Sequence, residues 1–142
     1  MDIMKRFLIV EDEALSRSIL NSFFSEFAAC DTAENGFEAL ALFKNAILDG
    51  NPYDLICTDL VMPVLDGYEL ITKVRESEEA LPIKDYMRTK IFVISVSDSH
   101  VDMAHALLEC DCDDYIVKPF HRDQLKSLLE KYSLLESGHN IP

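Results

Sequence analysis

The sequence predicts an α/β protein in which a doubly wound sheet of five parallel strands carries helices on both faces, a (βα)5 arrangement. Three observations predict it. Five short apolar runs alternate with longer segments of helical periodicity, which is the pattern of parallel strands joined by crossover helices. Three of the runs are rich in Val, Ile and Leu, as strands buried on both faces are. The length of 142 residues fits a single domain.

The five apolar runs are the expected strands. The first, third and fourth are the most apolar and are expected at the centre of the sheet. This favours the flavodoxin-like class with strand order 2-1-3-4-5. The runs cover residues 7–10, 28–32, 55–57, 91–94 and 115–117.

Five helices are expected between and after these strands, each from apolar residues three or four positions apart. All five apolar stripes are expected to face the core. The stripes are Leu15, Ile19, Phe23 and Phe27; Leu40, Phe43 and Ile47; Leu70, Ile71 and Val74; Val101, Ala104 and Leu108; and Leu125, Leu128, Leu129 and Tyr132.

The polar segment 76–90 is expected to be a surface connection. Its acidic run, formed by Glu76, Glu78 and Glu79, is expected to be solvated.

Charge and hydropathy exclude several classes of function. The chain has 26 acidic and 13 basic residues and a formal net charge of −13, so direct binding to nucleic acid or to an anionic membrane surface is not expected. No apolar stretch approaches the roughly 20 residues of a membrane span, and the N-terminal segment does not resemble a signal peptide. The expected localisation is cytoplasmic.

The cysteines and histidines are expected to have no special chemistry. The four cysteines show no disulfide framework and are expected to be reduced. Cys110 and Cys112 form a C-x-C pair without a second ligand pair, which argues against a metal site. The four histidines are expected at the surface.

Polar residues follow four of the predicted strands, and their types suit one reaction. Glu11 and Asp12 follow the first strand, Asp59 the third, Ser95 ends the fourth and Lys118 ends the fifth. Ligands of such sheets bind beyond the carboxyl ends of the strands, so these side chains are expected to converge. Clustered carboxylates favour a hard cation such as Mg²⁺. A carboxylate nucleophile beside a lysine and a hydroxyl suits phosphoryl transfer.

Four stretches resemble the receiver domain of response regulators in two-component signalling, including the chemotaxis type. They are FLIVEDE (7–13), DLICTDLVMPVLDG (54–67), IFVISVS (91–97) and DDYIVKPF (113–120). Each is at a predicted strand end, in the family's order, and the resemblance covers about residues 5–135. It implies a domain at 1–135 and a short tail at 136–142 with no output domain, belonging either to a stand-alone receiver or to a longer regulator or hybrid kinase.

The resemblance implies a role for each residue around the nucleophile. Asp59 would be the phosphoacceptor, and Lys118 would form an ion pair with it and then with its phosphate. Asp12 would bind Mg²⁺ directly, Glu11 would act through metal-bound water, and the backbone carbonyl of Val61 would be a further ligand.

The resemblance also implies a switch. Ser95 would contact the phosphoryl oxygen and move toward it, and Tyr115 would be an aromatic rotamer switch that swings inward. Pro119 would follow a cis peptide bond that aims Lys118. Phosphorylation would remodel the face formed by the fourth helix, the fifth strand and the fifth helix.

The chain departs from the family pattern at four positions. Glu11 stands where Asp is frequent, and Asp111 stands where glycine commonly ends the fourth helix. Asp tolerates left-handed backbone geometry. Val96 follows the serine where a small residue is usual, and Val61 would face the attacking water. We hypothesise that the two valines slow hydrolysis of the acyl phosphate; the alternative is that they only fill space.

Three functions are therefore weighed. The leading one is a phosphorylation switch, a signalling protein rather than an enzyme. A histidine kinase or a histidine phosphotransfer protein would be the donor, the downstream target would be a protein, and homodimerisation is possible. The second is a pseudo-receiver, an interaction module that is not phosphorylated, and the complete set of acids, serine and lysine argues against it. The third is a phosphatase, disfavoured because Val61 cannot transfer a proton.

Overall fold

The computed structural model describes residues 4–82 and 88–135, so the predicted tail lies outside the described residues. Five parallel strands form one sheet in the order β2-β1-β3-β4-β5, which confirms the predicted class. The second strand lies one residue later than expected, and the ends of the others match to within one residue. The strands are β1 Arg6–Val10, β2 Ala29–Ala33, β3 Leu55–Thr58, β4 Lys90–Ser95 and β5 Asp114–Val117.

Five α-helices follow the strands, and the fourth continues into a turn of π-helix. Capping side chains fix where three of them begin: those of Asn35, Asp66 and Ser99 each accept a hydrogen bond from the backbone N–H three residues on. The helices are α1 Ala14–Phe24, α2 Gly36–Leu48, α3 Gly67–Glu79, α4 His100–Ala104 and α5 Arg122–Lys131, and the π-helical turn is His105–Glu109.

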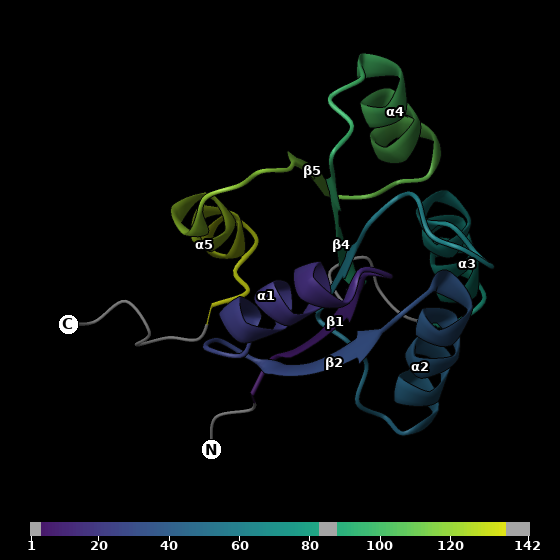
Figure 1. The fold of residues 1–142 in the computed structure, drawn as a ribbon. Helices are drawn as coiled ribbons and strands as arrows, with labels where there is room; N and C mark the ends of the chain where they lie inside the picture. The colour runs from purple at the N-terminus through teal and green to yellow at the C-terminus, as the bar shows by residue number, and fades with distance from the viewer. Residues whose placement is uncertain (1–3, 83–87, 136–142) are drawn as a thin grey trace.

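The sheet is the middle of three layers (Figure 1). Alternate residues of β1 belong to opposite clusters, because successive side chains of a strand point to opposite faces. Phe7 and Ile9 pack with α1 and α5, whereas Leu8 and Val10 pack with α2, α3 and the π-helical turn. Both faces of the central strands are buried, as their uninterrupted apolar runs predicted.

The predicted stripe of α1 is partly wrong. Leu15 and Ile19 are exposed, and the buried residues of the helix are Leu20, Phe23 and Phe24. The buried stripe is therefore displaced around the helix, and two large apolar side chains face solvent near the carboxyl ends of the strands.

The predicted stripe of the fourth helix is wrong throughout. Val101, Ala104 and Leu108 are all exposed. No residue of α4 is buried, and the side chain that enters the core is Ala106 in the π-helical turn. The buried side of this segment carries Ala106 and Cys110, four residues apart, and the predicted stripe lies on another side.

The prediction that the acidic run after Arg75 is solvated is also partly wrong. Helix α3 continues to Glu79, and Glu78 is buried rather than solvated. The buried Arg75 guanidinium donates to Glu78 Oε1 at 2.7 Å and to Asp113 Oδ2 at 2.9 Å. It also donates to the carbonyls of Thr89 and Asp111. These bonds tie the end of α3 to the loops that lead into β4 and β5.

Asp111 has the left-handed backbone expected of it, with φ 71°. Within the described residues, no helix is both long enough and apolar enough to cross a membrane.

Candidate functional site

The predicted acidic residues meet at the carboxyl edge of the sheet. Glu11 and Asp12 follow β1, and Asp59 follows β3, which is the neighbour of β1 in the sheet. The Asp59 N–H donates to the Val10 carbonyl at 3.2 Å, which holds the two strand ends together. One ligand oxygen from each of the three carboxylates lies within 4.8 Å of the others.

Lys118 reaches this cluster from β5. Its backbone N–H donates to the Ser95 carbonyl at 2.7 Å, so the end of β4 fixes where the lysine leaves the sheet. Its Nζ lies 2.8 Å from Glu11 Oε2 and 3.2 Å from Asp59 Oδ2. The Lys118–Pro119 peptide bond is cis, as expected.

The ion pair between Lys118 and Glu11 was missed in the sequence. The resemblance paired the lysine with Asp59 alone, yet its nearer partner is Glu11. The sequence did carry an indication of this pair, which is the glutamate at position 11 where aspartate is frequent. Its extra methylene lets the carboxylate extend to Lys118.

Burial sets the electrostatics of the cluster. The side chain of Glu11 is 3% exposed, that of Asp59 14% and that of Lys118 17%. Burial, together with the charge of Asp59, raises the pKa of Glu11 above its ordinary value, although Lys118 opposes this. Burial lowers the pKa of Lys118, but its hydrogen bond to Glu11 and the two carboxylate charges outweigh that, and the net pKa is raised.

The loop after β3 orients Asp59. The Leu60 N–H donates to Asp59 Oδ1 at 2.6 Å, and Gly67 donates its N–H to the Leu60 carbonyl at 2.9 Å. A Cβ on Gly67 would overlap the Asp59 carbonyl, so this position requires glycine. Val64 in the same loop has φ 72°, an unfavourable conformation for a β-branched residue.

Ser95 and Tyr115 are linked through one residue that sequence reasoning missed. Ser95 is buried at the end of β4, and its Oγ accepts a hydrogen bond from the Ser97 N–H at 3.2 Å. The Tyr115 hydroxyl donates to the Ser97 carbonyl at 3.0 Å. The two peptide groups of Ser97 thus contact both predicted switch residues. The sequence did not indicate this role, because a serine two positions after a strand end is not distinctive by itself.

Two valines flank the site with exposed side chains. Val61 lies two residues after Asp59, and Val96 directly follows Ser95. That the Val61 carbonyl is a metal ligand stays a prediction.

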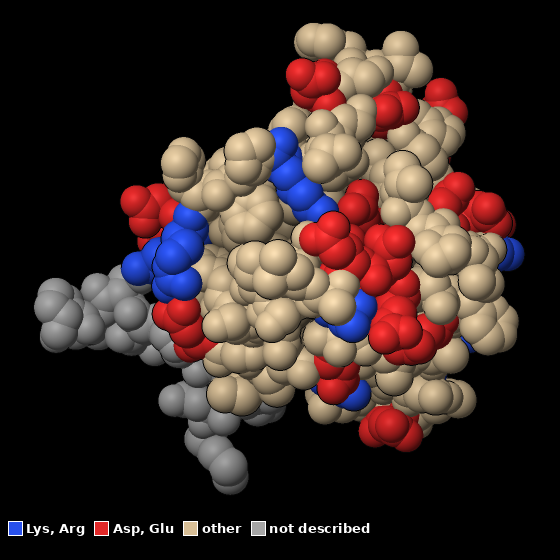
Figure 2. Space-filling model, viewed as in Figure 1, with Lys and Arg blue, Asp and Glu red and all other residues tan. Residues whose placement is uncertain are grey.

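The donor set fits Mg²⁺. Three carboxylates supply hard oxygen ligands, and one of them, Asp12, is exposed to solvent. Figure 2 shows acidic side chains gathered over the region where β1 and β2 end, with few basic ones among them. A carboxylate beside an ammonium and a cation site is chemically suited to accept a phosphoryl group.

Comparisons with known proteins agree with this chemistry. The family model of the response regulator receiver domain matches residues 7–130. The transcriptional regulatory protein ResD of Bacillus subtilis (strain 168) is 36% identical over 133 residues, which are 90% of this chain and 49% of ResD. The two-component response regulator ORR41 of Oryza sativa subsp. japonica is 31% identical over 134 residues, covering 92% of this chain and 96% of its own.

A solved structure with a similar sequence also has this fold. It is the response regulator protein TrrA of Thermotoga maritima in complex with Mg²⁺–BeF, with 32% identity and a TM-score of 0.69 over 91% of this chain and 99% of TrrA. Several of the curated relatives are longer proteins: this chain spans about half of ResD and 27% of the regulatory protein AtoC of Escherichia coli (strain K12).

Proposed function

The chain belongs to the response regulator receiver domain family, and from that membership we propose that Asp59 accepts a phosphoryl group from a histidine kinase or a histidine phosphotransfer protein. The family consists of signalling switches rather than classical enzymes. The observation that carries the proposal is the contact of Asp59 with Lys118 at 3.2 Å inside the acidic cluster.

The proposed step is a phosphoryl transfer between two side chains. A carboxylate oxygen of Asp59 attacks the phosphorus of a phosphohistidine. The O–P bond forms as the N–P bond breaks, and the imidazole leaves with the electron pair of that bond. Lys118 holds Asp59 in place and then stabilises the charge on the phosphoryl oxygens. Water later attacks the phosphorus, which releases phosphate and restores Asp59.

We propose that Glu11, Asp12, Asp59 and the Val61 carbonyl hold Mg²⁺, with Glu11 acting through water. When bound, the cation neutralises negative charge on the transferred group. The proposal rests on the oxygen donors within 4.8 Å of one another and on the solved complex of TrrA with Mg²⁺–BeF.

We propose that the signal leaves the site through Ser97. A phosphoryl group that draws Ser95 toward it would move the Ser97 N–H bonded to Ser95 Oγ, and Tyr115 is bonded to the carbonyl of the same residue. The affected surface is the face of α4, β5 and α5, where Val101 and Leu108 are exposed. A downstream protein, or a second copy of the chain, would bind there.

We propose that the phosphodonor docks beside α1, away from the face formed by α4, β5 and α5. Ile19 of α1 is exposed, and it lines a shallow groove with Lys118, Pro119 and Phe120. An apolar surface beside the entrance to Asp59 suits a docked protein domain better than a small polar donor.

The first experiment is the intact mass of the protein after incubation with Mg²⁺ and a small acyl phosphate. Wild type is expected to gain one phosphoryl group, and Asp59→Asn none. Asp98→Asn is the matched control, because Asp98 is an exposed aspartate outside the cluster. No adduct on wild type contradicts the proposal and favours the pseudo-receiver, and an adduct that persists in Asp59→Asn contradicts the assignment of Asp59 as the acceptor.

A further inference from the structure

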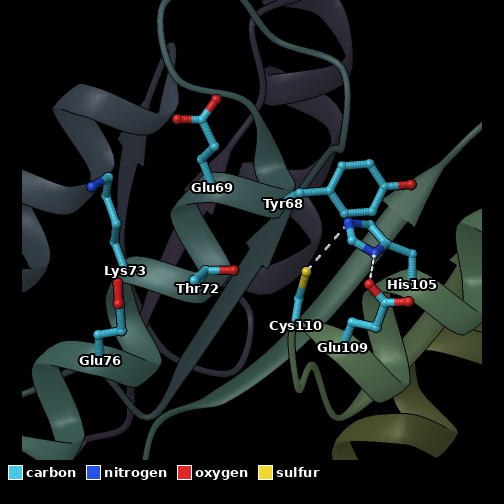
Figure 3. Close-up of a pocket in the computed structure, with 8 residues that line it drawn as sticks. All are labelled: Tyr68, Glu69, Thr72, Lys73, Glu76, His105, Glu109 and Cys110. Atoms are coloured by element: carbon cyan, nitrogen blue, oxygen red, sulfur yellow. Dashed lines mark hydrogen bonds and ion pairs between the residues drawn. The ribbon is translucent and has the colours of Figure 1, made fainter.

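A second cluster of titratable side chains lies outside the phosphorylation site, in a groove between α3 and the π-helical turn (Figure 3). Three of them, His105, Glu109 and Cys110, come from the π-helical turn and the residue after it. A fourth, Tyr68, comes from α3. The phosphoryl chemistry proposed above uses none of the four.

The π-helical turn brings His105 and Cys110 together. The Cys110 N–H donates to the His105 carbonyl at 3.0 Å, an i→i+5 hydrogen bond. In an α-helix, residues five positions apart are rotated by about 140° around the axis and do not face each other. Here His105 Nε2 lies 3.8 Å from Cys110 Sγ. Single turns of π-helix are rare and are often found at functional sites.

The imidazole is held so that Nε2 faces the sulfur. Nδ1 lies 2.7 Å from Glu109 Oε2, and a carboxylate in that position favours the tautomer with its proton on Nδ1. The Tyr68 ring lies against the imidazole, with centroids 4.3 Å apart and planes at 59°. Figure 3 shows His105 between Tyr68 and Glu109, with Cys110 on the side of the other ring nitrogen.

We propose that His105 Nε2 and Cys110 Sγ bind a thiophilic transition-metal ion of the Zn²⁺ class. With Zn–N and Zn–S bonds of about 2.1 and 2.3 Å, their separation corresponds to an N–Zn–S angle of about 120°, near that of a tetrahedral ion. As the S–metal bond forms, the thiol proton leaves to solvent. Glu109 is a carboxylate that orients the ligating histidine, and water fills the remaining positions.

The surroundings select a soft cation at this site. Glu69, Glu76 and Glu109 line the groove together with a single lysine, Lys73, so its net charge attracts cations. Imidazole and thiolate ligands favour Zn²⁺ over Mg²⁺. Cys112 does not belong to the site, since its Sγ is directed to the Asp114 carbonyl at 3.6 Å. The relevant pair is therefore not the C-x-C pair weighed in the sequence.

The test uses Co²⁺ as a spectroscopic substitute for Zn²⁺, with excess Mg²⁺ present to occupy the acidic cluster. Wild type is expected to develop a thiolate-to-cobalt charge-transfer band. Cys110→Ser and His105→Ala are expected to lose it, whereas their matched controls, Cys112→Ser and His100→Ala, retain it. Glu109→Gln is expected to weaken Zn²⁺ binding by about tenfold in a calorimetric titration.

The band separates this site from the phosphorylation site. Oxygen ligands give no thiolate band, so Asp59→Asn is expected to keep it, and the result is independent of whether Asp59 is phosphorylated. Circular dichroism of each variant verifies that it is folded. The absence of the band in wild type, or its persistence in folded Cys110→Ser or His105→Ala, would overturn the proposal.

Discussion

The Lys118 ammonium donates to Glu11 Oε2 at 2.8 Å, a shorter distance than to the predicted phosphoacceptor. One lysine thus contacts two carboxylates that follow adjacent strands, the buried Glu11 and the partly exposed Asp59. Any cation that binds among these carboxylates shares Glu11 with the lysine, so the charge of Glu11 is central to the site.

Glu11→Gln is expected to weaken Mg²⁺ binding by about tenfold. The substitution keeps the size of the side chain and removes one of three clustered charges. Even at the dielectric constant of water, about 80, a unit charge about 5–6 Å from a divalent ion is worth about 1.4–1.7 kcal/mol, which is about tenfold in binding. Isothermal titration calorimetry measures the effect. Glu13→Gln is the control, because the Glu13 carboxylate accepts a bond from Ser16 outside the cluster. Equal dissociation constants for wild type and Glu11→Gln would exclude Glu11 from the metal site.

Lys118→Met is expected to destabilise the protein more strongly without Mg²⁺ than with it. Without the lysine, the carboxylates of the buried Glu11 and the partly exposed Asp59 repel each other, at a cost of about 1–3 kcal/mol. A bound cation takes over the neutralisation. Urea unfolding in chelator and in saturating Mg²⁺ compares the two conditions, with Lys44→Met on the exposed side of α2 as control. The same loss in both conditions would contradict this reasoning.

Val61→Asn and Val96→Ala are expected to speed hydrolysis of the phosphorylated protein. An amide at position 61 can hold the attacking water, and one hydrogen bond worth about 1 kcal/mol in the transition state corresponds to about a fivefold faster rate. Both valines are exposed, so the substitutions have little effect on folding. Decay of the phosphorylated mass peak gives the rate. Unchanged decay in the double variant would leave the valines with no role in the lifetime of the signal.

Val64→Asn is expected to stabilise the protein by about 1 kcal/mol. Val64 has φ 72° and is 79% exposed. Asparagine adopts this conformation more readily, and no apolar burial is lost. Val96→Asn is the control, since it is an exposed valine outside the left-handed region. Chemical unfolding measures the free energy of unfolding of both variants. Equal changes in the two would show that the backbone of Val64 is not strained.

Arg75→Met is expected to lower the free energy of unfolding by about 3–5 kcal/mol. Removal of a buried guanidinium leaves Glu78 and Asp113 without their shared cation. Arg88→Met is the comparison. Its short ion pair, at 2.6 Å, is with the mostly exposed Asp111, and its approach to the buried Glu78 is longer, at 3.8 Å, so the loss is expected to stay below about 1 kcal/mol. Urea unfolding of both variants tests this. Comparable losses would show that burial does not determine how much these ion pairs contribute to the free energy of unfolding.

The sequence predicted the sheet and the location of the acidic cluster because both depend on simple regularities. Uninterrupted apolar runs mark strands buried on both faces, and parallel strands bring their carboxyl ends to one edge. This was enough to place Glu11, Asp12 and Asp59 together, and Lys118 beside them.

Other features of the fold and the site depend on three-dimensional geometry that the spacing of apolar residues does not predict. The fourth helix has apolar residues on more than one side, so its period alone did not show which side faces the core: Val101, Ala104 and Leu108 are exposed, whereas Ala106 and Cys110 are buried. The burial of Glu78 follows from a guanidinium that also reaches the two loops leading into β4 and β5, an arrangement that only the tertiary fold produces. The pair of Glu11 and Lys118 joins residues 107 positions apart.

Helix α4, with no buried residue, has a thermodynamic consequence. Its displacement breaks little apolar packing, so it is a low-energy cooperative unit of the domain. Its amide protons are expected to exchange with deuterium long before those of β1 and β3. If phosphorylation moves α4 as proposed, the phosphoryl group needs to supply only a small free energy, because the packing of the sheet and the other helices is kept.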